Sequence, residues 1–158
     1  TLIALSAVLA LIRDPETMRD LDVLVLESTY GGRTHAQAEE ASGQLRTIVG
    51  RAIERGGKVL IPSFALARAQ EILYHLAGLI HAGDLPEVPV YVDSPMATAV
   101  THVFEKSHEY MDEEYQALRA RMGRVMSAPW VHFTSSVEDS KAVTASTDPC
   151  IEIGRAHV

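Results

Sequence analysis

Residues 56–74 read GGKVLIPSFALARAQEILY and contain the pattern that decides the fold of this chain. The apolar run at 58–61 predicts a buried strand, and residues 62–64 supply a turn after it. From residue 65 to residue 82, apolar side chains return every three or four positions, which predicts a helix with one buried face. The stretch therefore encodes a strand that is followed directly by a helix.

The same strand-and-helix unit recurs on both sides of this stretch. Upstream, residues 22–27 (DVLVLE) predict a buried strand and residues 35–55 predict a helix that a glycine pair ends. Downstream, the expected elements are a strand at 88–92, helices at 96–104 and 109–123, a strand at 131–134, a short helix at 136–141 and a strand that begins at residue 150. Such alternation is typical of right-handed crossovers within a parallel sheet. The predicted fold class is α/β, with a Rossmann-like parallel sheet.

Composition and charge exclude several classes of protein. The chain has 158 residues, about one domain's worth, and an apolar fraction of 47%, which is enough for a core and argues against disorder. With 14 basic and 21 acidic residues its net charge is −7, which is not typical of a protein that coats nucleic acid without specificity. Its one cysteine, Cys150, excludes an internal disulfide and a cysteine-rich zinc site, and favours a cytoplasmic protein.

Several sequence signatures are absent. The apolar run at 1–12 is too short for a membrane span and has no basic region before it, so we interpret it as a buried strand or helix and expect no membrane contact. The motifs of dinucleotide-binding, P-loop and α/β-hydrolase sites are missing. None of the seven histidines stands at the H-x-H or H-E-x-x-H spacing of a zinc site.

Polar residues follow the predicted strands at the points where those strands end. In open α/β sheets, ligands bind beyond the carboxyl ends of the strands. Glu27, with Thr29 and Tyr30 after it, ends the first predicted strand. A carboxylate that stands directly after a buried strand is partly desolvated, which raises its pKa and suits it to proton transfer. Glu27 is therefore the first candidate for a catalytic group.

Two further polar groups follow the second and third predicted strands. Ser63 and Arg68 belong to the second, and Asp93 and Ser94 to the third. Serines in such places more often cap the next helix than bind a substrate, so for Ser63, Ser94 and Ser136 we expect caps before substrate contacts. Arg68 falls in the first turn of its helix, where the helix dipole disfavours a cation. We therefore expect it to pair with an acid or an anionic ligand.

Four strings occur in order along the chain: DVLVLESTYGGRTH at 22–35, GGKVLIPSFALARAQEILY at 56–74, PVYVDSPMA at 89–97 and FTSSVEDSKAV at 133–143. Together they resemble the β-CASP family of metallo-β-lactamase-fold ribonucleases, which includes the cleavage and polyadenylation endonuclease subunit and RNase J. The resemblance covers residues 13–151. Four ordered motifs make it highly specific.

The resemblance implies a phosphodiesterase that acts on RNA with two zinc ions, where metal-activated water attacks the phosphodiester. In that family the metals lie between a metallo-β-lactamase domain and the β-CASP domain inserted into it. RNA and the metallo-β-lactamase domain of the same chain are thus the expected partners. Glu27 matches the acid of the first β-CASP motif, which partners a histidine near the leaving group, so we expect it to be catalytic by orienting a general acid. The matching strings imply these substrate contacts: Thr29, Tyr30, Ser63, Arg68, Asp93 and Ser94.

The family's H-x-H-x-D-H metal cluster and its later histidines have no counterpart in the chain, so the resemblance implies a fragment that is inactive alone and binds no zinc. We expect residues 1–30 to be the end of the metallo-β-lactamase part, with a non-native origin of 1–12 left open, and 31–151 to be an incomplete β-CASP domain. Residues 152–158 (EIGRAHV) equal the in-frame translation of a widely used sequencing adapter, which predicts a non-native tail. An exposed sheet edge would also allow a homodimer.

Two other interpretations stay open. The first is a non-catalytic β-CASP scaffold or RNA-binding subunit of a processing complex. Glu27 argues against it, because a degenerate site has no need of that carboxylate. The second is an unrelated α/β module that binds a small phosphorylated ligand, which fits the strand pattern but not the four ordered strings. The sequence does not distinguish endonuclease from 5′ exonuclease action.

Overall fold

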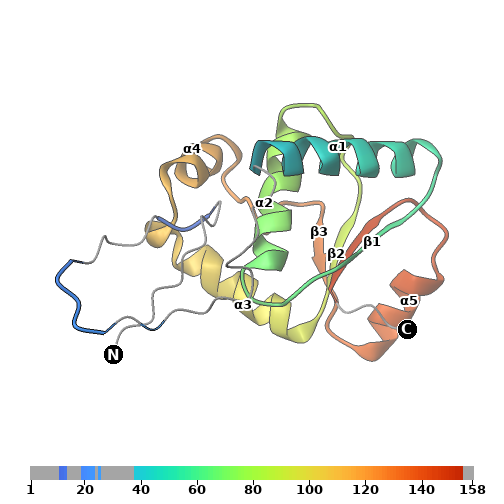
Figure 1. The fold of residues 1–158 in the computed structure, drawn as a ribbon. Coiled ribbons are helices and arrows are strands. Elements are labelled where there is room, and N and C mark those ends of the chain that lie inside the picture. Colours follow the sequence, from blue (N-terminus) through green and yellow to red (C-terminus); the bar gives the residue numbers. More distant parts are fainter. Residues whose placement is uncertain (1–10, 14–18, 24, 26–37, 155–158) are drawn as a thin grey trace.

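The computed structural model describes residues 11–13, 19–23, 25 and 38–154, and its centre is a parallel sheet (Figure 1). Four strands are hydrogen-bonded in the order β1-β4-β2-β3, and every neighbouring pair is parallel. The strands are β1 (Val59–Pro62), β2 (Val90–Asp93), β3 (Val131–Phe133) and β4 (Ile151–Gly154). The predicted α/β class with a parallel sheet is confirmed.

Helices connect these strands and cover the sheet. In chain order they are α1 (Ala38–Glu54), α2 (Arg68–His81), α3 (Pro95–Lys106), the 3₁₀ turn η1 (His108–Tyr110), α4 (Glu113–Met122) and α5 (Val137–Ala145). Helices α2 and α3 lie on one side of the sheet and α5 on the other (Figure 1). Within the described ranges, no helix has the length and apolar character that a membrane crossing requires. The helices predicted around each strand are confirmed, with ends that differ by a few residues.

The core lies between the sheet and helices α2 and α3. Alternate residues of the central strands are fully buried there, among them Val90, Val92 and Ile153. Leu73 and Leu76 of α2 are also fully buried in the same cluster. The apolar residues that recur at helical spacing in α2 thus pack in one core with the alternate apolar residues of the strands. This packing fixes the sheet, and with it the carboxyl ends of the strands.

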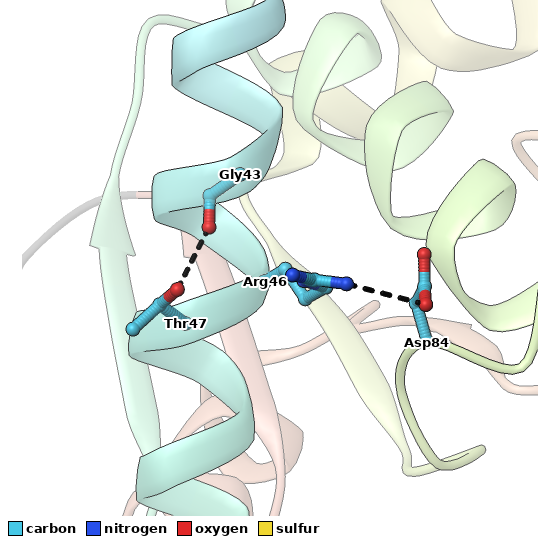
Figure 2. Close-up of polar contacts among 4 residues, drawn as sticks. All are labelled: Gly43, Arg46, Thr47 and Asp84. Carbon is cyan, nitrogen blue, oxygen red and sulfur yellow. Dashed lines mark hydrogen bonds and ion pairs between the residues drawn. The ribbon is translucent and has the colours of Figure 1, made fainter.

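Helix α1 is fastened to the connection that follows α2. The Arg46 guanidinium forms an ion pair of 3.4 Å with the Asp84 carboxylate, marked by a dashed line in Figure 2. On the same helix, the Thr47 hydroxyl donates a hydrogen bond of 2.9 Å to the Gly43 carbonyl. Both ion-pair partners are about half exposed, so this pair stabilises the fold little. Val49, which is 1% exposed, anchors α1 to the core instead.

Two predicted features near the N-terminus have different outcomes. Most of the strand expected at 22–27 lies outside the described residues. Val23 and Val25, which are described, are 64% and 53% exposed, so the burial expected for them was wrong. Leu11, by contrast, is buried, and its carbonyl accepts a backbone hydrogen bond from Asp112.

The predicted domain boundary at residue 151 falls inside β4. That strand continues to Gly154 and pairs with β1 on one side and β2 on the other. Ile151 and Ile153 are both fully buried in the core. Residues 152–154 are therefore part of the sheet, and residues 155–158 lie outside the described part.

Candidate functional site

The segments that follow the four strands lie along one edge of the sheet, because all four strands are parallel. Ser63 follows β1, Gly154 ends β4, Asp93 ends β2 and Thr134 follows β3. A backbone hydrogen bond of 3.0 Å from the Ser63 N–H to the Gly154 carbonyl joins two of these segments. We call this edge, which is defined by these four residues, the carboxyl edge.

Asp93 is the buried acid of the carboxyl edge, with 6% of its surface exposed. Its Oδ1 accepts a hydrogen bond of 2.7 Å from the Thr134 hydroxyl, and its Oδ2 accepts one of 2.7 Å from the Ser140 hydroxyl. Hydrogen bonds to an ionised carboxylate offset much of the cost of burying it. Asp93 thus ties the end of β2 to α5 and to the residue after β3. Its contact with a substrate stays a prediction.

Two of the three serines expected as helix caps are caps. The Ser94 Oγ accepts a hydrogen bond of 3.2 Å from the Ala97 N–H at the start of α3. The Ser136 Oγ accepts one of 3.0 Å from the Asp139 N–H at the start of α5. Both satisfy a donor that the first turn of a helix leaves unpaired. The capping prediction is therefore confirmed at Ser94 and Ser136.

The prediction of a cap at Ser63 was wrong. Its hydroxyl donates to the carbonyl of Phe64 instead, and Ala67 holds the N-cap position of α2 without a side-chain hydrogen bond. The chain makes an additional turn between β1 and α2, in which Ala67 has a φ of 66° that non-glycine residues rarely adopt. This turn leaves Phe64 and Leu66 exposed by 83% and 66% beside the carboxyl edge. No pattern in the sequence predicted a role for either residue.

Arg68 has an acidic partner, as expected. Its guanidinium lies 2.8 Å from the Glu71 carboxylate, one helical turn along α2. The Arg68 side chain is 62% exposed, so solvent screens this pair and its contribution to stability is small. The guanidinium thus stands at the start of α2 with most of its surface open to a ligand.

The connection from β3 to α5 is held by Asp139, which the sequence analysis did not name. The Asp139 Oδ2 accepts hydrogen bonds from the Ser135 N–H, the Ser135 hydroxyl and the Ser136 N–H, at 3.1, 2.8 and 3.0 Å. These bonds favour the charged form and lower the pKa of the Asp139 carboxyl. With the Ser136 cap they make a capping box. Its spacing, a serine three residues before an acid, is a signal that the sequence already contains.

We expect the Asp139 capping box to stabilise the chain only while its carboxylate is charged. Because the pKa of Asp139 is lower in the folded chain than in the unfolded one, its contribution is present above the ordinary aspartate value near 4 and is lost as the pH falls below it. Urea unfolding of the wild-type chain and of Asp139→Asn should show a stability difference at pH 7 that shrinks between about pH 4 and pH 2.5.

Glu138→Gln is the matched control, because it removes the neighbouring carboxylate of the same helical turn, which accepts none of these three hydrogen bonds. Its effect on stability should be the smaller at neutral pH. A stability difference for Asp139→Asn that does not change with pH would contradict the assignment.

Three of the predicted site residues, Glu27, Thr29 and Tyr30, lie outside the described residues. The structure brings Ser63, Asp93 and Ser94 to one edge, with Arg68 at the start of the adjacent helix. In the part of the chain that the structure describes, no three His, Cys, Asp or Glu side chains gather as a metal ion would require. The described residues therefore do not fit a zinc centre.

The chain is similar in sequence to a protein family and to several known proteins. Residues 69–154, more than half of the chain, match the family described as the Beta-Casp domain. The chain is 36% identical to "Ribonuclease TTHA0252" of Thermus thermophilus over 138 residues, which are 87% of this chain and 32% of that protein. It is 32% identical over 130 residues to "Transcription termination factor FttA" of Lokiarchaeum, at 81% of this chain and 20% of the relative. It is 39% identical over 85 residues to "Cleavage and polyadenylation specificity factor 73" of Drosophila melanogaster, at 53% of this chain and 12% of that protein. The chain thus spans a third or less of the length of these relatives.

Proposed function

The chain belongs to the β-CASP family, and from that membership we propose that it forms the β-CASP part of a longer ribonuclease that hydrolyses RNA phosphodiesters. The observation that carries this proposal is the match to a named ribonuclease over 87% of the chain. The match to the family, over residues 69–154, includes three of the four residues of the carboxyl edge, Asp93, Thr134 and Gly154. A second relative is named as a cleavage and polyadenylation factor, which also indicates action on RNA.

The proposal divides the chemistry between two parts of the protein. Zinc ions, when bound, would activate water and polarise the phosphate. Since the described residues of this chain do not fit a zinc centre, we assign metal ligation to the metallo-β-lactamase part. The role left to this chain is to bind and orient RNA at the carboxyl edge and to orient a proton donor through Glu27.

The residues of the carboxyl edge suit this role in different ways. Arg68 is a mostly exposed cation and can bind an RNA phosphate through its planar guanidinium. Ser63 and Ser94 follow β1 and β2 directly, on either side of the end of β4, where their hydroxyls can donate to phosphate or ribose oxygens. Asp93 is buried and already bonded to two hydroxyls, so we assign it the positioning of the β2 end.

The decisive experiment compares the 158-residue chain with a longer protein that contains both parts. The longer protein should cleave a 5′-labelled single-stranded RNA, lose cleavage after dialysis against a chelator, and regain it when zinc is added back. The 158-residue chain alone should neither cleave the RNA nor retain zinc in elemental analysis. Cleavage that survives removal of the metal would contradict zinc-dependent hydrolysis. RNA binding without cleavage by the zinc-loaded protein would favour the scaffold alternative.

A further inference from the structure

A pocket of about 470 Å³ lies between α5 and the sheet, on the side opposite α2 and α3. Tyr91 of β2 and His132 of β3 line the sheet side of the pocket. Asp139 lines it from α5, and Asp148 and Cys150 line it from the segment that leads into β4. Its volume is in the usual range for a ligand site. The proposed function does not use this pocket.

Two aromatic rings form the sheet side of the pocket. Tyr91 and His132 are directly paired in the register of β2 and β3. Their ring centroids are 5.2 Å apart and their planes differ by 32°, so the two rings lie close to side by side on neighbouring strands. Tyr91 is half-buried and His132 is exposed. Such a pair offers flat π surface on which a planar group can stack.

The charges of the pocket select which planar group can enter it. Asp139 and Asp148 line the pocket, and no lysine or arginine is among the described residues that line it. The ammonium of Lys58 lies beside the pocket, where it donates to the backbone carbonyl of Val143. The hydrogen bonds from Ser135 and Ser136 lower the pKa of Asp139, so this carboxylate is charged at neutral pH. Two carboxylates against one neighbouring ammonium leave the pocket net negative, so it favours a cation over a phosphate group.

We propose that this pocket binds the guanidinium group of an arginine side chain that a partner protein presents. Guanidinium is both planar and always charged, so it can stack on Tyr91 and His132 while its N–H groups donate to the carboxylates. A lysine ammonium has the same charge but no plane to stack. A nucleotide base can stack, but the phosphates attached to it meet two acids.

The test titrates the 158-residue chain with N-acetyl-arginine methylamide at pH 8, where histidines are ordinarily neutral, and follows the ring signals of Tyr91 and His132 by NMR. The matching lysine derivative and cytidine monophosphate are titrated in parallel. Arginine should produce saturable shifts of both rings. It should bind at least about tenfold more tightly than lysine, because only guanidinium can stack and donate in parallel.

Two variants and a control locate the site. Asp148→Asn removes one exposed carboxylate of the pocket, and Tyr91→Leu removes a stacking ring; each should weaken arginine binding about fivefold or more. Glu138→Gln is the control, because it removes one negative charge from α5 at a residue that does not line the pocket. Arginine binding to this variant should stay within about twofold of binding to the wild type. Should Tyr91→Leu fail to fold, Asp148→Asn still decides, since Asp148 is exposed.

Equal binding of the arginine and lysine derivatives would overturn the proposal, because it would indicate attraction by charge alone. Absence of saturable shifts would also overturn it. Tighter binding of cytidine monophosphate at the same two rings would reassign the pocket to a nucleotide base. The readout is binding, not RNA cleavage, so this inference can fail while the proposed ribonuclease function holds, and the reverse is also true.

Discussion

Replacing Glu27 by glutamine in the longer ribonuclease is expected to reduce turnover about 100-fold or more, the usual size of a general acid–base contribution. In the proposed mechanism Glu27 would act through a histidine and not on the RNA directly, which would make it a positioning residue. Glutamine keeps the shape of the side chain but loses the negative charge that, on this proposal, would hold the imidazole in its protonated form. The KM for RNA and the zinc content should change little. Single-turnover and steady-state cleavage rates on one labelled RNA measure the effect.

A pH profile separates this role from a merely structural one. A nearby carboxylate raises the pKa of an imidazolium, and a general acid must be protonated to act. Glu27→Gln should therefore move the falling limb of the kcat profile to lower pH. Glu54→Gln, an exposed acid at the end of α1, is the matched control and should cleave at the wild-type rate. Wild-type turnover in Glu27→Gln would remove this residue from the mechanism.

Local patterns were enough to predict the elements of this fold. The stretch at 56–74 indicates a strand and a helix, and β1 and α2 lie within a few residues of the predicted positions. The parallel sheet follows from the alternation of strands and helices, and it brings the polar residues after each strand to one edge. The helix caps at Ser94 and Ser136 could be predicted for the same reason, because a cap depends on residues within one helical turn.

Contacts between distant segments could not be predicted in this way. The order of the sheet places β4 between β1 and β2, although β4 comes last in the chain. No local pattern contains that order. The partners of Asp93 are Thr134 and Ser140, more than 40 residues away in sequence, so its structural role was not foreseen. The prediction of a cap at Ser63 was wrong because an additional turn at Ala67 precedes α2. Alanine rarely adopts the positive φ of that turn, so the sequence does not predict it.

The position of β4 leads to the second large effect. Gly154→Ala in the 158-residue chain is expected to lower the free energy of unfolding by about 3 kcal/mol or more. A Cβ at this position would lie 2.5 Å from the backbone carbonyl oxygen of Asp93. Because both groups belong to the backbones of paired strands, neither can move without breaking the sheet. The φ of Gly154 is also 149°, in a region that only glycine adopts readily. Urea unfolding followed by circular dichroism measures the loss.

Two other glycines separate the steric clash from the backbone conformation. Gly123 has a φ of 79° but nothing within 4 Å of its Cβ position, so Gly123→Ala should cost about 1 kcal/mol. Gly43 lies in α1 with open space around it, so Gly43→Ala should be neutral or stabilise by up to about 1 kcal/mol. If Gly154→Ala costs no more than Gly123→Ala, the close approach of β4 to Asp93 does not persist in solution. If it costs much more, the close approach of the β4 end to the Asp93 backbone is present in solution, and the pairing of these two strands keeps the buried acid at the carboxyl edge.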